Sequence, residues 1–161
     1  MKRDKRLYPL SWEHHELLLY ADQIKMTLTA EHPSYRQSLN ELIEKSKIFW
    51  NLIFFNHIQV EKEALFSPLI KYTDFQEEIK VLNRGFDECT YLYTEITKDL
   101  IQDDDLKNKL VRFSELVIHH VRFEERELFN KIQVHLNKAE FDLISTQLKV
   151  RLPRVCKSTQ K

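Results

Sequence analysis

The chain has 161 residues, enough for one domain with a sizeable core, and it combines one glycine and four prolines with 31% charged residues. So few helix breakers favour long helices joined by short links. The formal net charge is zero with histidine neutral, which excludes the strongly basic balance typical of nucleic-acid binding. No apolar run is long enough for a membrane span or a secretion signal, and the two cysteines form no disulfide framework. We therefore expect a cytoplasmic protein with neither a nucleic acid nor a membrane as partner.

We predict a single domain over residues 1–161, with a helical bundle over about 11–133 and a short helix and basic tail over 137–161. Both ends of the chain carry clustered cations, which we interpret as solvated tails. These cations are Lys2, Arg3, Lys5 and Arg6 at the start, and Lys149, Arg151, Arg154, Lys157 and Lys161 at the end.

The first helix is predicted from about Trp12 to Ala30, after an extended lead-in, because Ser11 is a favourable N-cap residue. Its apolar face consists of Leu17, Leu18, Ala21, Ile24 and Leu28. Extending this face backwards reaches His14, whereas His15 falls about 100° away around the helix. The periodicity therefore selects His14 as the inward histidine.

The second helix is predicted to begin at a capping box of Ser34 with Gln37 and to end near Phe66. Its inward apolar stripe consists of Leu39, Leu42, Ile43, Phe49, Trp50 and Ile53. His57 and Glu61 continue this stripe, so both side chains are expected to point into the core, where an unpaired carboxylate is costly.

The third helix is predicted from about Asp74 to Ile101, after a capping box of Thr73 with Gln76. Its apolar stripe alternates steps of four and three residues, which is typical of bundle packing: Phe75, Ile79, Leu82, Phe86, Cys89, Tyr93, Ile96 and Leu100. Gly85 interrupts this helix at a cost of about 1 kcal/mol relative to alanine, and close approach of a neighbour would explain it.

The fourth helix is predicted from the cap Asp103-Asp104-Asp105 to about Gln133, and a fifth from Asn137 to about Leu148. One face of the fourth helix carries Leu106, Leu110, Phe113, Val117, His120, Glu124 and Leu128. Four long helices with short links predict an all-α protein, an antiparallel up-down-up-down four-helix bundle with a short C-terminal fifth helix.

One motif occurs twice, as His57 with Glu61 and as His120 with Glu124, and Leu-Phe follows each histidine at +8 and +9. Residues i and i+4 lie on one helix face, so each imidazole and carboxylate can bind one metal centre. Three helices thus direct five candidate metal ligands inward: His14, His57, Glu61, His120 and Glu124. Imidazole and carboxylate together suit iron, manganese or zinc. A polar core network without a metal is the alternative.

Three segments, residues 9–15, 57–66 and 120–129, resemble bacterial hemerythrin-like proteins with the HHE cation-binding domain. The resemblance covers roughly residues 7–133. It implies a four-helix bundle around a non-haem di-iron centre, with a histidine from each helix and a bridging carboxylate from helices two and four. Carried over by motif, the ligands are His14, His57, Glu61, His120 and Glu124.

The chain departs from that family at its third helix, where Phe86 stands in place of the expected histidine. The number of irons, one or two, therefore stays open. The implied role is O₂ or NO sensing or handling, or iron homeostasis. The alternative is a metal-free bundle that acts as an interaction or structural protein. No Ser/His/Asp or Cys/His arrangement stands out, so no catalytic residue is predicted, and the oligomeric state is left open.

Overall fold

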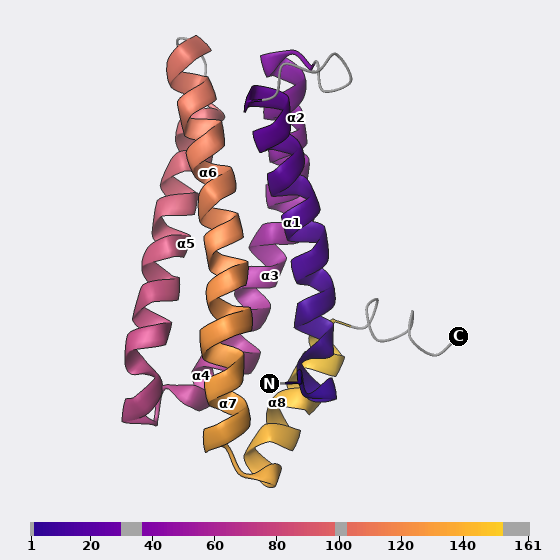
Figure 1. The fold of residues 1–161 in the computed structure, drawn as a ribbon, viewed down its shortest axis with the longest axis vertical. Coiled ribbons are helices and arrows are strands. Elements are labelled where there is room, and N and C mark those ends of the chain that lie inside the picture. The colour runs from indigo at the N-terminus through magenta and orange to yellow at the C-terminus, as the bar shows by residue number, and fades with distance from the viewer. Residues whose placement is uncertain (1, 30–36, 99–102, 153–161) are drawn as a thin grey trace, which may run out of the picture.

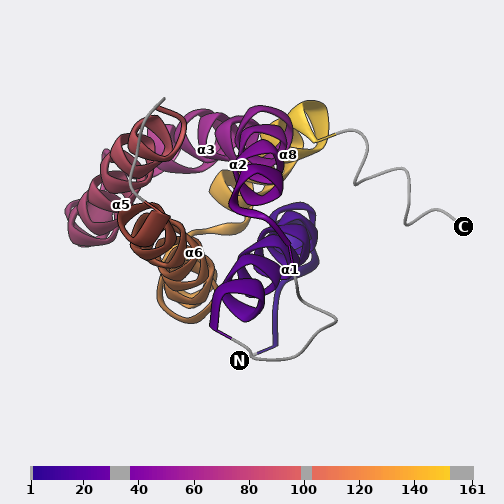
Figure 2. The same ribbon diagram turned by 90° about the horizontal axis from the view of Figure 1, so that it is seen from above.

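A computed structural model of the chain describes residues 2–29, 37–98 and 103–152. Within these ranges the regular structure is helical throughout and contains no strand, which confirms the prediction of an all-α protein. Four long helical segments lie side by side along the longest axis (Figure 1) and surround a common interior when viewed from above (Figure 2). The candidate ligands lie in this interior.

Each long segment is built from several consecutive helical elements. The first comprises η1 (Lys5–Leu7) and α1 (Tyr8–Thr29). The second comprises α2 (Leu39–Phe49), η3 (Trp50–Phe54), α3 (Phe55–Val60), η4 (Glu61–Phe66) and α4 (Ser67–Leu69). The third comprises η5 (Thr73–Phe75) and α5 (Gln76–Ile96), and the fourth α6 (Asp103–Phe123), η6 (Glu124–Leu128) and α7 (Phe129–His135). The separate helix α8 (Lys138–Arg151) lies beside η1.

The first segment is helical earlier than predicted, so the expected extended lead-in is wrong. Asp4 caps η1 by accepting a hydrogen bond from the backbone N–H of Arg6 (2.9 Å), and Ser11 lies inside α1 rather than at its start. Leu7 and Leu10 are fully buried, so tertiary packing favours helix in this segment despite the basic sequence.

The predicted solvated tail at the N-terminus is wrong for Arg3 and Arg6, whereas Lys2 and Lys5 are exposed as expected. Arg3 forms an ion pair with Glu125, and Arg6 forms one with Asp142 (3.0 Å). Both anions are more than a hundred residues away along the chain, so local charge patterning does not indicate them. Several predicted features lie outside the described residues: the cap Ser34, the helix ends at Ala30 and Ile101, and the cations Arg154, Lys157 and Lys161.

Capping boxes begin two of the helices. Asn137 and Glu140 form a box before α8, where a helix was predicted to begin, and Ser38 with Glu41 forms one before α2. The box predicted at Thr73 is wrong, because the chain there forms the 3₁₀ turn η5 without any side-chain cap.

Gly85 is a helix-interior glycine without a packing reason. Apart from its chain neighbours and the backbone of its own helix, a Cβ added there would meet no atom within 4 Å, so the expected close approach of a neighbour is wrong. We expect Gly85→Ala to raise the free energy of unfolding by about 0.5–1 kcal/mol, because alanine restricts the unfolded chain and favours helix. Urea denaturation of both proteins measures this difference. A destabilised variant would contradict the open space at this position.

Candidate metal centre

Five side chains from three of the long segments meet in the interior. One ligand atom from each residue, an imidazole nitrogen or a carboxylate oxygen, lies within 4.8 Å of the other four, and all five side chains are buried: His14, His57, Glu61, His120 and Glu124. The ring centroids of His57 and His120 are 5.7 Å apart. The predicted convergence of these residues is therefore confirmed.

The two carboxylates lie between the three imidazoles. Glu61 Oε1 is 2.5 Å from His57 Nε2, and Glu61 Oε2 is 3.3 Å from His120 Nε2. His14 Nε2 lies 3.1 Å from Glu124 Oε2 and 3.8 Å from Glu61 Oε1. Each histidine thus directs its Nε2 atom toward the same small volume.

Three of these polar atoms are buried without a hydrogen-bond partner. They are His57 Nε2, Glu61 Oε2 and Glu124 Oε1. The close contacts of His57 Nε2 with Glu61 Oε1 and of Glu61 Oε2 with His120 Nε2 lack the geometry of a hydrogen bond. A buried polar atom left unsatisfied costs about 1–3 kcal/mol, and more when it is charged. A cation between the two carboxylates would satisfy these atoms together, so the donor set fits a metal ion.

Charges within the cluster explain its protonation preferences. Burial alone would raise the pKa of Glu61, but the charges of His57 and His120 outweigh burial and hold that pKa well below its usual value. Burial, and then the neighbouring Glu61 carboxylate, raise the pKa of Glu124. Burial alone would lower the pKa of His57, yet Glu61 and Glu13 raise it to about 9. The buried carboxylates therefore require positive charge, which protonated imidazoles or a metal cation supply.

A π-helical turn begins at each of the two glutamates. Glu61 is the first residue of η4, and Glu124 is the first residue of η6. In a regular α-helix each residue turns by about 100°, so the phenylalanine at +9 would lie on the opposite face from its histidine. The wider π turn between them changes the angle between the two side chains. Phe66 and Phe129 are both buried, and Phe129 stacks on the His14 ring (centroids 5.6 Å apart, interplanar angle 11°). Phe129 of the second motif therefore packs on the cluster, and Phe66 of the first lies beside Phe86 (centroids 6.2 Å apart).

Two further carboxylates, which the motif did not predict, bind the outer nitrogens of the histidines. Glu13 Oε2 lies 2.9 Å from His57 Nδ1, and Glu125 Oε1 lies 2.8 Å from His14 Nδ1. Such contacts fix the ring orientation of metal-binding histidines and increase their basicity. In the sequence these glutamates are notable only as neighbours of His14 and Glu124, because the histidines they bind belong to other helices.

An apolar ring occupies the position on the third segment where the resemblance implies a histidine. Phe86 is buried, and its ring centroid lies 5.0 Å from that of His120. Asp87 is exposed, and the Glu88 carboxylate binds Arg112 on the surface (2.8 Å). Within the described residues, the third long segment therefore supplies no member of the cluster.

His14 belongs to the cluster, whereas His15 is exposed, as the periodicity predicted. We expect His14→Ala to lower metal occupancy at least tenfold, because one imidazole is lost from the cluster, and His15→Ala to leave it unchanged. Metal analysis of both purified variants measures the difference. A greater loss from His15→Ala would contradict the helix phase on which the ligand set depends.

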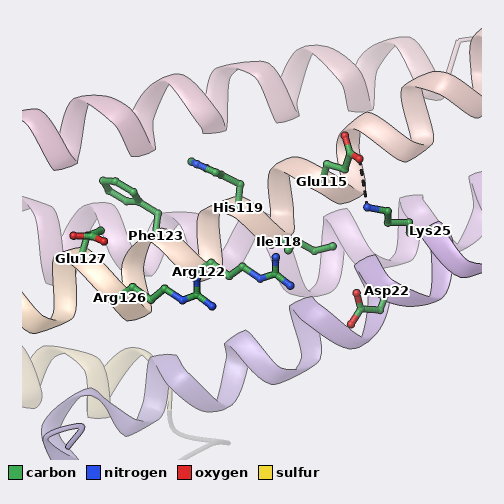
Figure 3. A pocket seen from close by; sticks show the side chains of 9 residues that line it. All are labelled: Asp22, Lys25, Glu115, Ile118, His119, Arg122, Phe123, Arg126 and Glu127. Carbon is green, nitrogen blue, oxygen red and sulfur yellow. Dashed lines mark hydrogen bonds and ion pairs between the residues drawn. The ribbon is translucent and has the colours of Figure 1, made fainter. Parts of the chain in front are cut away.

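A separate surface groove of about 490 Å³ lies between α1 and the fourth segment, outside the cluster (Figure 3). Lys25 and Glu115 form an ion pair of 3.4 Å in it. Its charged residues comprise three cations, Lys25, Arg122 and Arg126, and three anions, Asp22, Glu115 and Glu127. This balance gives the groove no electrostatic preference for a cationic or an anionic ligand.

No helix in the described ranges has the length and apolar character needed to cross a membrane. Comparisons of the chain with models of known protein families, with curated proteins and with solved structures find no match. The site itself must therefore support any conclusion about function.

Proposed function

We propose that this protein binds non-haem iron in a bundle of the hemerythrin-like type, with His14, His57, Glu61, His120 and Glu124 as the ligands. The observation that carries the proposal is the group of five buried donors within 4.8 Å of one another. The path of the ribbon in Figure 1 supports the antiparallel up-down-up-down arrangement that belongs to this proposal.

The chemistry of the donors favours iron. Three imidazoles and two carboxylates provide five nitrogen or oxygen ligands and no thiolate. Structural zinc sites are mostly closed by four ligands, often including cysteine, and magnesium and calcium prefer oxygen alone. Imidazole with carboxylate and an open coordination position is typical of non-haem iron. Bound iron would supply a site for a small ligand such as O₂ or NO, in a cytoplasmic sensing, handling or iron-homeostasis role.

Metal analysis with an optical spectrum tests this proposal. Protein is expressed in iron-rich medium and purified anaerobically without chelator, and at least one equivalent of iron per chain is expected. Manganese or zinc in place of iron would contradict the choice of metal but retain the site. A metal-free protein, with a melting temperature that added iron does not change, would contradict the site itself.

One observation favours the second candidate, a metal-free interaction protein. Ile48, Leu52 and Phe55 follow one another at helical spacing on the second segment, and their exposed fractions are 58%, 72% and 51%. Such an apolar stripe is typical of a surface that contacts another protein. Iron content separates the two candidates, because only the first requires metal.

A further inference from the structure

The His14 ring is held from two directions. Its Nδ1 atom lies 2.8 Å from Glu125 Oε1, which fixes rotation within the plane of the ring. The Phe129 ring lies nearly parallel to it, with centroids 5.6 Å apart, which fixes the tilt of that plane. Together these contacts direct His14 Nε2 toward Glu61 and Glu124.

Arg3 contacts both groups that hold His14. Its Nε atom donates a hydrogen bond to Glu125 Oε2 (3.0 Å), and its Nη2 atom donates to the same carboxylate and to the Glu125 carbonyl. The guanidinium carbon also lies 4.7 Å from the centroid of the Phe129 ring. A planar guanidinium is suited to both contacts, because it binds carboxylates through several N–H groups and packs on aromatic faces.

The remaining residues of the N-terminal segment fix Arg3 in place. The Asp4 backbone N–H donates to Gln133 Oε1 on α7 (2.7 Å). Arg6 binds Asp142 on α8 (3.0 Å), and its guanidinium lies 3.9 Å from the centroid of Phe141, also on α8. The segment is thus attached to both α7 and α8, which gives α8 a structural connection to the cluster.

We propose that Arg3 is a positioning residue of the metal centre, which fixes His14 through Glu125 and Phe129. This inference rests on the proposed function, because it concerns how tightly the same site holds a metal. Removing a group that orients a metal ligand typically lowers metal affinity 10–100-fold. Arg3 therefore influences the metal affinity of the centre although its side chain is not one of the ligands.

The test is a cobalt(II) titration of the full chain, in which visible absorption bands report the ligand field and a competing chelator gives the affinity. Arg3→Met removes the hydrogen bonds but keeps an unbranched chain against Phe129. It is expected to weaken cobalt binding about tenfold or more and to alter the bands. Arg3→Lys keeps the charge and is expected to lie between the two proteins. Lys5→Met, an exposed cation of the same segment, is the control and should match the unmutated chain.

A double-mutant cycle separates positioning from general stability. If Arg3 acts through Glu125, Arg3→Met combined with Glu125→Gln should weaken binding no more than Glu125→Gln alone. If the double variant instead loses affinity by the product of the two single losses, Arg3 does not act through Glu125. If Arg3→Met leaves both the cobalt affinity and the absorption bands unchanged, the proposal is overturned. Circular dichroism shows whether Arg3→Met is folded. If it is not, the absorption bands of cobalt-loaded Arg3→Lys are compared with those of the unmutated chain, and unchanged bands overturn the proposal. Absence of cobalt binding by the unmutated chain would instead refute the proposed function, and this inference with it.

Discussion

Replacing both buried glutamates, as Glu61→Ala with Glu124→Ala, is expected to abolish metal binding. Both side chains are fully buried and lie among the three imidazoles. Without them the cluster keeps three neutral nitrogen donors but no negative charge to compensate a dehydrated cation. We therefore expect iron content to fall below detection and cobalt affinity to fall at least a hundredfold. Metal analysis and cobalt titration measure these losses.

The matched control removes two carboxylates from the same two segments at the surface. Glu63 and Glu127 are both exposed, and each lies a few residues after one of the two buried glutamates. Glu63→Ala with Glu127→Ala should therefore keep the metal content of the unmutated protein. If the buried carboxylates only neutralise histidines, the unmutated chain will bind no metal. Glu61→Ala with Glu124→Ala will then lower the melting temperature without changing the metal content. That result would favour the polar core network.

Helical periodicity accounts for what could be predicted of the site. His14, His57 and His120 each extend an apolar stripe, and a stripe on a bundle helix must face the interior. The inward direction of all three residues followed from local sequence, as did the outward direction of His15. Convergence of the three histidines also required that they lie at the same level along the bundle, which only the structure shows.

Contacts between distant segments account for what could not be predicted. Glu125 and His14 lie 111 residues apart, and Arg3 and Glu125 lie 122 apart, so no local pattern links them. The helical start of the chain depends on burial of Leu7 and Leu10 rather than on a cap at Ser11. The π turns η3, η4 and η6 also depart from the α-helical period, so that period cannot indicate them.

We expect the unmutated protein to hold one metal ion tightly and a second one weakly or not at all. At metal–ligand distances of about 2.1 Å, two ligands on opposite sides of one ion are separated by about 4.2 Å. The observed limit of 4.8 Å is close to this value. Two ions in one site lie about 3.5–4 Å apart and need a wider set of donors. One ligand atom from each of the five residues can therefore surround a single ion, and the third segment offers no imidazole for a second.

The surroundings of Phe86 support the expectation that a second ion binds weakly or not at all. Its ring lies 6.2 Å from that of Phe66, and the Lys62 ammonium nitrogen is 5.4 Å from its centroid. A cation near this ring would meet apolar carbon and a positive charge in place of a ligand. Asp87 and Glu88 do not replace the missing donor, because the first is exposed and the second binds Arg112.

Phe86→His is expected to add a second metal equivalent and, with iron, the absorption of an oxo-bridged pair that the family resemblance implies. The new imidazole would stand beside His120, because the ring that it replaces lies 5.0 Å away between centroids. Phe86→Leu removes the ring without adding a donor and should still bind one equivalent, so it is the matched control. Anaerobic iron titration followed by an optical spectrum measures both variants. Two tightly held irons in the unmutated protein would refute the mononuclear centre. An unchanged stoichiometry in Phe86→His would contradict the role given to Phe86.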